Sequence, residues 1–575
     1  MGNVFSCRAA VWKHAKKADT PPYIIDVVQS VGITRVQITK NETSSKCGEM
    51  AVEEIAREKL TASADKPDGS EIGLSRSSQC PVHSHRSRST HAVTTSVFEN
   101  LTPSVKSWEE VPGPKPLPLL GNTWRFIPHI GGYSVEHVDK VCMSLRREYG
   151  KCVKIAGLLG RPDMLFVFDA GEVERVFRSE DAAPHRPSMP SLNYYKHTLR
   201  KDFFGAEKDC AGVIAVHGDS WSAFRTKVSR VALSAGAAAQ YTEQVADVAD
   251  CFIKRIQEIR DENLETPDDF LNEIHKWSLE SLGLIALDTR LGCFQSHEGS
   301  DSQRLINAVH TFFLCVGELE LRTPWWRIYP TAMFKRYVAA LDTILSVTLS
   351  HVERALDKCD NSNKSLLQDL VSAAGTRVAA VTSLDMFLVG IDTTSNAVAS
   401  TLYQLSSRPE VQERLYDEIS NVLQGRQLKP GDVNQMPYLK ACVKEVLRLY
   451  PVVIGNGRQL TKDTVICGYK IPKGTQVIFQ HYVMGNSDEY FAEAQQFLPE
   501  RWLQKSSYKH PFASLPFGFG RRMCLGRRFA ELEMHIMICK IVQNFKMEYH
   551  HEPLDYHIHP MYTPNGPLKI KFIER

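Results

Sequence analysis

The sequence lacks the features that define several protein classes. None of its 14 cysteines belongs to a CxxC pair, and they are scattered from Cys7 to Cys539 without regular spacing. A disulfide framework is therefore not expected, and a reducing compartment fits this cysteine usage better. The net charge is only +3 over 575 residues, which excludes a generally basic nucleic-acid binder but not a local basic patch.

Long apolar runs and internal repeats are also missing. No stretch of about 18 or more apolar residues is present, so we expect no transmembrane helix. The best candidate near the N-terminus, YIIDVVQSVGI, is too short and contains an aspartate. The hydrophobic content of 43% is ordinary for a globular protein that buries a sizeable core.

The first twenty residues carry competing targeting signals. Cations at positions 8, 13, 16 and 17 precede the first acid, Asp19, and such a start resembles a mitochondrial transit peptide. An ordinary basic tail has the same composition. Residues 2–6 also match the myristoylation pattern M-G-x-x-x-S, with Cys7 as a candidate for palmitoylation. The tail by itself leaves all three interpretations open.

Residues 1–107 differ in composition from the rest. The stretch 63–96 is rich in Ser, Thr, His and charge and has few apolar residues, so it cannot bury enough surface to offset its ordering entropy. A zinc site is an alternative, but the spacing of its four candidate ligands fits no standard motif. Those candidates are Cys80, His83, His85 and His91. We predict a disordered leader over 1–107, containing the transit peptide, and one folded domain over 108–575.

The pattern of residues 108–575 favours a mainly α fold with a minor β part. Residues 134–150 have apolar residues at helical spacing and end on Gly150 as a C-cap. The apolar run 376–407 predicts a helix of about 45 Å, long enough to cross a large domain. Short β-like runs at 152–168 and 464–480 contain glycines suited to hairpin turns.

One cysteine lies among glycines and arginines in PFGFGRRMCLGRRFAELEM, residues 516–534. Gly518, Gly520 and Gly526 permit positive φ and the close approach of a flat group. Apolar residues at helical spacing predict a helix after Cys524, and a helix N-terminus stabilises a thiolate. Cys524 is thus suited to ligate or to attack, and a buried, inert thiol is the alternative.

The same stretch fits the pattern F-x-x-G-x-R-x-C-x-G through Phe517, Gly520, Arg522, Cys524 and Gly526. It resembles the haem-binding signature of the cytochrome P-450 family at every position. The resemblance covers about residues 111–575 and implies the cytochrome P-450 fold, with haem b between the long central helix and the cysteine loop. It also implies a Cys524 thiolate as axial iron ligand and insertion of one oxygen atom into a C–H bond.

Glu445 and Arg448 lie three residues apart in KEVLRLYP and face the same way on a predicted helix. Such a pair is usually an exposed ion pair that contributes little to the stability of the fold. The resemblance implies instead that Glu445, Arg448 and Arg501 form the family's structural triad behind the haem. The planar guanidinium fork suits such a buried, bidentate network better than lysine would.

Gly390, Asp392 and Thr393 interrupt the apolar run 376–407. A helix kink is one interpretation, because a threonine hydroxyl can bond to a carbonyl one turn earlier. The resemblance implies the family's oxygen-activation segment, in which the glycine leaves room over the iron and Asp392 and Thr393 relay protons to dioxygen. The small residue usual before that glycine is Val389 here, which is expected to narrow the space above the haem or alter substrate access.

Trp221 and Arg225 lie four residues apart and share a predicted helix face. Taken alone, this pattern more often reflects packing beside an exposed charge. The resemblance implies that the W-x-x-x-R pair meets the haem propionates. Arg458 and Arg522 match family positions with the same task, so three cations are expected to face two carboxylates.

Two basic pairs remain. Arg527 and Arg528 open the helix after Cys524, where cations oppose the helix dipole, and Lys440 and Lys444 lie four residues apart. A solvated basic face is the simplest interpretation.

The combinations LKxxxKExLR and CLGRRxAExE resemble those of mitochondrial members of the family, of insect type. Those members receive electrons from an acidic, adrenodoxin-like ferredoxin and its reductase, and a basic patch would steer such a partner. This implies a peripheral location on the matrix side of the inner membrane, with N-myristoylated membrane attachment as the alternative.

The expected function is therefore hydroxylation of a hydrophobic sterol, lipid or xenobiotic, with no nucleic-acid partner. One alternative is a haem-thiolate isomerase or dehydratase without external electrons, but such enzymes usually lack the acid–alcohol pair. Another is a non-catalytic haem or lipid carrier, which needs neither a proton relay nor basic docking pairs. The segments 191–205 and 452–456 are expected to line the substrate pocket.

Overall fold

The computed structural model describes residues 23–30, 33–40, 105–234, 236–295, 299–357, 365–504, 509–558 and 561–575. The chain divides into two compact units, Met1–Phe98 and Glu99–Arg575. In the first unit, β1 (Tyr23–Ser30) and β2 (Ile33–Lys40) form an antiparallel hairpin. This pairing lies within the leader predicted to be disordered, and its many Ile, Val and Thr residues favour strands. The rest of residues 1–104, with the targeting signals and the zinc candidates, lies outside the described residues.

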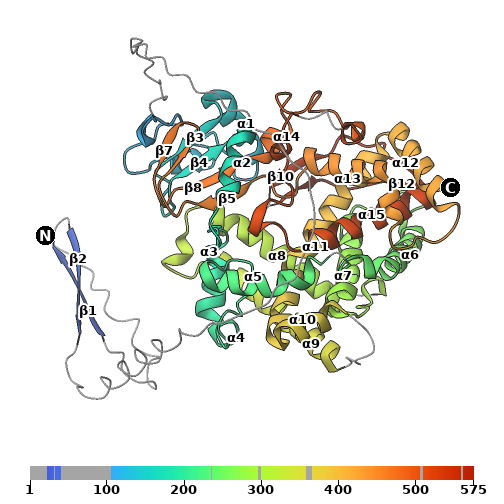
Figure 1. Cartoon of the computed structure of the whole chain (residues 1–575), viewed down its shortest axis with the longest axis horizontal. Helices are drawn as coiled ribbons and strands as arrows, with labels where there is room; N and C mark the ends of the chain where they lie inside the picture. The colour runs from blue at the N-terminus through green and yellow to red at the C-terminus, as the bar shows by residue number, and fades with distance from the viewer. Residues whose placement is uncertain are drawn as a thin grey trace, which may run out of the picture. The chain divides into compact units, whose positions relative to one another are not determined.

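The second unit is mainly helical, as predicted (Figure 1). Its helices are α1 (Val138–Tyr149), α2 (Ala170–Arg178), α3 (Pro190–Tyr194), α4 (Lys201–Phe204), α5 (Gly218–Ala232), α6 (Thr242–Ile259), α7 (Phe270–Leu287), α8 (Asp301–Leu321), α9 (Ala332–Asp357), α10 (Leu366–Ala374), α11 (Thr376–Ser406), α12 (Pro409–Leu423), α13 (Pro437–Leu449), α14 (His481–Gly485) and α15 (Arg527–Asn544). The C-cap predicted at Gly150 is confirmed, with φ of 94°.

The β part is small and mostly antiparallel. Four strands form one sheet in the order β3 (Cys152–Ile155), β4 (Met164–Val167), β8 (Gln476–Phe479) and β5 (Asn456–Gln459), in which β4 and β8 are parallel. Three two-stranded antiparallel sheets are β6 (Thr464–Ile466) with β7 (Tyr469–Ile471), β9 (Phe545–Glu548) with β12 (Lys571–Glu574), and β10 (Asp555–Ile558) with β11 (Tyr562–Asn565). Both predicted β segments are confirmed.

Helix α11 is the axis of the helical region. It runs for 31 residues, and α7, α9, α10 and α15 pack against it. Among the described residues it is also long and apolar enough to cross a membrane by length and composition, although 78% of its most apolar window is buried. A helix surrounded by protein must be apolar on all sides, which accounts for this composition.

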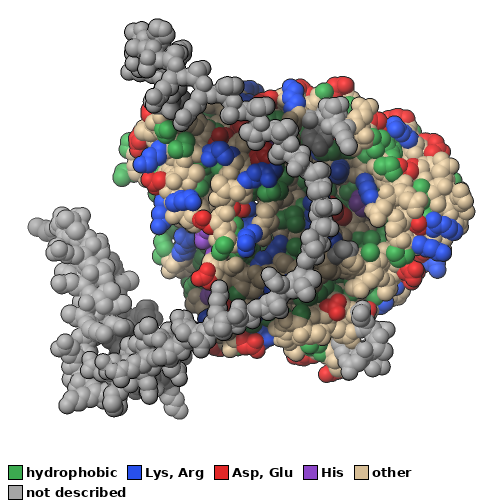
Figure 2. All heavy atoms as spheres, viewed as in Figure 1, with side chains coloured by type: hydrophobic (Ala, Val, Ile, Leu, Met, Phe, Trp, Pro, Cys, Tyr) green, Lys and Arg blue, Asp and Glu red, His purple; other side chains and the backbone are tan. Residues whose placement is uncertain are grey.

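Two apolar clusters organise the second unit. The larger surrounds α11 and joins most of the helices, and the smaller lies against the four-stranded sheet and α2. Figure 1 shows the sheet beside α1 and α2, away from α6, α7 and α9. On the face shown in Figure 2, Lys and Arg side chains are interspersed with Asp and Glu, in keeping with a net charge near zero.

Candidate functional site

The cysteine loop joins a short 3-10 turn, Gly520–Arg522, to α15. The Cys524 backbone N–H donates to the Phe517 carbonyl at 2.9 Å, which closes the loop. Gly518 and Gly520 have φ of 70° and 72°, a region that favours glycine. Gly526 differs from our expectation: its φ is −83°, and it serves as the N-cap of α15.

Cys524 is exposed at the surface of the described chain. Enough protein nevertheless surrounds the sulfur that burial raises the pKa of its thiol. The Gly526 N–H and the Arg225 and Arg186 guanidiniums act in the opposite direction and favour the thiolate.

Four guanidiniums gather beside this loop. Arg225 donates to the Met523 carbonyl at 2.8 Å, which ties α5 to the cysteine loop. Arg522 donates to the Pro184 and Val216 carbonyls at 2.9 and 3.1 Å, and its guanidinium lies 3.5 Å from the centre of the Trp221 ring. The other two are Arg186 and Arg458, and the charges of all three neighbours act on Arg522.

The positive charge of these four guanidiniums exceeds the negative charge of the carboxylates beside them. Arg458 pairs with Glu180 at 2.5 Å, but burial and then the charges of Arg186, Arg458 and Arg225 lower the pKa of Arg522 to about 9. Nearby, the Nδ1 atoms of His185 and His217 are buried and have no hydrogen-bond partner among the described residues. A flat group bearing two carboxylates matches this set of donors.

The donor set also bears on how iron could be held. No cluster of three or more His, Cys, Asp and Glu side chains suited to an ion occurs in the described parts of the chain. One thiol within a ring of cations therefore fits an iron carried by a porphyrin with acidic side groups, rather than a bare ion. Arg186 was missed by the sequence analysis, because in APHRPS it belongs to no spacing pattern.

Asp392 and Thr393 lie in α11. Asp392 is 3% exposed, and burial raises the pKa of its carboxyl to about 7. Its Oδ1 lies 3.5 Å from Nε2 of His275. The Thr393 hydroxyl donates to the Val389 carbonyl at 2.8 Å, which is the back-bond that the kink interpretation anticipated.

Gly390 has a packing role that the sequence did not indicate. A Cβ at this position would lie 3.1 Å from a methyl carbon of Leu282 in α7, which is tighter than ordinary van der Waals contact. The missing side chain therefore faces α7 and allows the two helices to approach closely. The resemblance had implied that this glycine leaves room over the iron.

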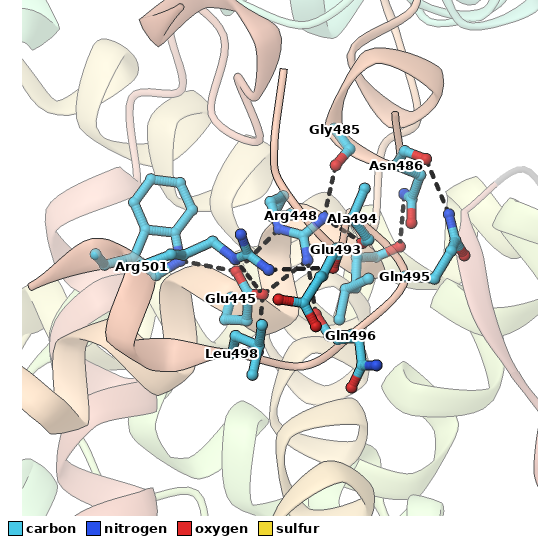
Figure 3. Close-up of polar contacts among 12 residues, drawn as sticks. Glu445, Arg448, Gly485, Asn486, Glu493, Ala494, Gln495, Gln496, Leu498 and Arg501 are labelled. Atoms are coloured by element: carbon cyan, nitrogen blue, oxygen red, sulfur yellow. Dashed lines mark hydrogen bonds and ion pairs between the residues drawn. The ribbon is translucent and has the colours of Figure 1, made fainter. Parts of the chain in front are cut away.

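The structure brings Glu445, Arg448 and Arg501 together (Figure 3). Arg448 donates to both carboxylate oxygens of Glu445 at 2.7 and 2.9 Å, and Arg501 donates to Oε1 at 2.9 Å. Trp502 also donates to this carboxylate at 2.9 Å, a partner that the sequence analysis missed. The Glu445 and Arg448 side chains are 0% exposed.

The guanidiniums extend this network to the backbone. Arg448 donates to the carbonyls of Gly485, Ala494 and Gln496, and Arg501 donates to those of Ala492 and Glu493. The network thus fixes the segment 485–502 against α13 (Figure 3).

The four basic residues that the sequence suggested for ferredoxin docking line one surface hollow. Lys440 and Lys444 of α13 and Arg527 and Arg528 of α15 border a depression of about 600 Å³, whose wall includes residues 514–518 of the cysteine loop. Burial and the charge of Lys444 lower the pKa of Lys440. Arg527 also pairs with Glu531 at 2.9 Å, so the hollow is predominantly but not purely basic.

Comparison with known proteins agrees with this geometry. A family model described as Cytochrome P450 matches residues 111–572. "Probable cytochrome P450 49a1" of Drosophila melanogaster is 46% identical over 87% of this chain and 88% of its own length. "Probable cytochrome P450 301a1, mitochondrial" is 44% identical over 83% and 88%, and "Probable cytochrome P450 12a5, mitochondrial" is 34% identical over 82% and 91%, both from the same organism. The chain belongs to the cytochrome P450 family.

Proposed function

We propose that this cytochrome P450 monooxygenase hydroxylates a hydrophobic substrate in mitochondria, with haem b ligated by Cys524 and electrons delivered by a ferredoxin. The observation that carries the proposal is the Cys524 thiol beside a cluster of four guanidiniums. The mitochondrial relatives support the location. The substrate class remains a sterol, lipid or xenobiotic.

The chain's own residues divide the work of holding the cofactor. Cys524 would ligate the iron, and Arg225, Arg458 and Arg522 would neutralise the two propionates. Trp221 supports Arg522 by stacking, and Phe517 closes the cysteine loop through its carbonyl. When bound, a thiolate-ligated haem supplies the chemistry that splits dioxygen, so that one atom enters a C–H bond and the other leaves as water.

An exposed apolar surface supports peripheral attachment to the inner membrane. It combines residues 117–130, the turn at 159–161 and the α8–α9 connection, which are linked by hydrogen bonds from Leu159 to Thr123 and from Arg161 to Arg322. Its most exposed members are Leu119, Ile328 and Ile130, at 96%, 77% and 70%. Contiguous exposed apolar residues are typical of membrane or protein contact surfaces.

The two alternative functions receive less support. An isomerase or dehydratase has no use for the basic hollow, because it takes no external electrons. A carrier would not need a buried acid next to a threonine in the central helix. The hollow and the Asp392–Thr393 pair therefore favour the monooxygenase.

The test is reconstitution of the purified protein with haem, followed by the spectrum of the reduced, carbon-monoxide-bound form. The band of a thiolate-ligated haem is expected, and turnover of a sterol or lipid panel should require both ferredoxin and reductase. Absence of the thiolate band in fresh protein would exclude all three haem-thiolate functions. Turnover without the ferredoxin system would favour the isomerase.

A further inference from the structure

A buried histidine meets the acid of the oxygen-activation segment. His275 lies on α7, which packs lengthwise against α11, and its Nε2 is 3.5 Å from Oδ1 of Asp392. The two side chains are 10% and 4% exposed. Neither atom has a hydrogen-bond partner among the described residues, and the 3.5 Å contact is longer than a usual hydrogen bond. Each buried polar atom therefore has the other as its natural partner.

Near pH 7 the histidine of this pair is neutral, and the acid is at the midpoint of its titration. Burial raises the pKa of Asp392 to about 7, and burial together with the charge of His310 lowers the pKa of His275 to about 3. A neutral imidazole can donate through Nε2 to the carboxylate, or accept at Nε2 from the protonated acid. One proton can thus reside on either side of the contact without leaving a buried charge on the histidine.

Neighbouring charges do not compete for this contact. On α7 itself, Glu273 pairs with Arg255 of α6 and with Lys276, and Glu280 pairs with Arg290. From α8, His310 acts on His275 and is exposed at the surface. His275 is therefore left with the buried acid Asp392, which adjoins Thr393 in the chain, as its nearest charged partner.

We propose that His275 is the positioning residue for Asp392 and the group that returns a proton to it from the solvent side. As Asp392 releases its proton toward Thr393, the Nε2 proton of His275 passes to the carboxylate in the same step in which Nδ1 takes up a proton from the solvent side. One proton enters the ring as another leaves, so the imidazole changes tautomer and stays neutral. This role rests on the proposed monooxygenase function, but the contact itself can be tested without turnover.

The test compares His275→Leu and His275→Gln with the wild type by infrared spectroscopy of the ferric holoprotein. The protonated Asp392 carboxyl band is assigned by its loss in Asp392→Asn. Leucine removes the donor, so the pKa of Asp392 should rise by about one unit. Glutamine keeps an N–H donor, so that pKa should remain near the wild-type value. Because an amide does not relay protons, hydrogen–deuterium exchange of the carboxyl should slow about tenfold in His275→Gln.

The matched control is His351→Gln, a half-buried histidine of α9 outside this contact. It should change neither the titration nor the exchange of Asp392. An unchanged Asp392 pKa in His275→Leu, or unchanged exchange in His275→Gln, would overturn the proposal. Failure of ferredoxin-dependent turnover in the wild type would instead remove the proposed function, since both infrared measurements need no electron donor.

Discussion

At Cys524, two effects on the sulfur oppose each other. Burial favours the thiol, whereas the Gly526 N–H and nearby arginines favour the thiolate. If Cys524 ligates the iron as proposed, coordination would resolve this competition, because a coordinating thiol loses its proton outright.

Replacement of Cys524 by alanine should therefore abolish thiolate ligation. The reduced, carbon-monoxide-bound spectrum should lose its thiolate band, because no other described cysteine lies in the guanidinium site. Cys539→Ala is the control: this thiol is buried on the same helix, and burial raises its pKa to about 12. An unchanged spectrum in Cys524→Ala would show that another residue ligates the iron.

Asp392 should make stability depend on pH. Its pKa is about 7 in the folded chain and about 4 in an unfolded one, so the folded state binds more protons between these values. Its contribution to stability is full below about pH 4, falls as pH rises to about 7, and is then constant. The shift corresponds to about 4 kcal/mol at most.

Asp392→Asn removes this titration. Its melting temperature relative to the wild type should increase from pH 5 to pH 8, measured by calorimetry on the holoprotein. The substitution should at the same time reduce turnover, since asparagine cannot release a proton. A melting difference that stays constant across this range would mean that Asp392 is not titrating in the folded protein.

At the scale of elements, the Glu445 network joins α13 to the segment 485–502. Glu445→Gln would leave two buried guanidiniums without their carboxylate, and breaking a buried ion pair in this way typically costs about 3–5 kcal/mol. Urea unfolding should show a loss of this size. Asp555→Asn is the control, because its pair with Lys140 is about 60% exposed on both sides and should change stability by less than about 1 kcal/mol. Equal small losses in the two variants would contradict the structural role of the network.

At the scale of the whole molecule, the basic hollow brings together two helices separated by more than seventy residues. Lys440 and Lys444 come from α13, and Arg527 and Arg528 come from α15. Its wall includes the cysteine loop, so a small acidic protein seated there would lie on the thiolate side. Complementary charge would speed its association at low salt.

Replacing Lys440 and Lys444 with glutamine should weaken ferredoxin binding about tenfold at low ionic strength. The difference should shrink as salt is added, because screening weakens exposed charges, and haem content should not change. Lys470→Gln with Lys473→Gln is the control, since these lysines lie at the β6–β7 hairpin and outside the hollow. If both double variants and the wild type bind ferredoxin with equal affinity across a salt titration, Lys440 and Lys444 do not contribute to docking and are simply solvated surface residues.

Much of the architecture could be predicted because it is encoded locally. The helix over 376–407, the hairpins at 152–168 and 464–480, and the helix after Cys524 follow from periodicity and turn residues, and each is confirmed. The hairpin at 23–40 was missed because composition averaged over a hundred residues concealed a short segment rich in β-branched residues.

Several site residues carry no local signal. No spacing pattern in the sequence includes Arg186, His275 or Trp502. Each of them contributes to the site through a contact with a residue far away in the chain. His275 meets Asp392 across 117 positions of sequence at 3.5 Å, and Trp502 reaches Glu445 across 57. Such contacts depend on how helices pack, which single-sequence periodicity does not specify.

The sequence by itself determined the class of chemistry, because one glycine-framed cysteine with its flanking residues is a contiguous pattern. It also determined the main helices, since apolar periodicity acts over one or two turns. Only the tertiary structure decided which charges share a site: it buried Glu445 with two arginines, gathered a fourth guanidinium beside Cys524, and placed His275 against Asp392. The physical reason is that desolvation and electrostatic coupling depend on distance in space, and chain folding alone sets that distance.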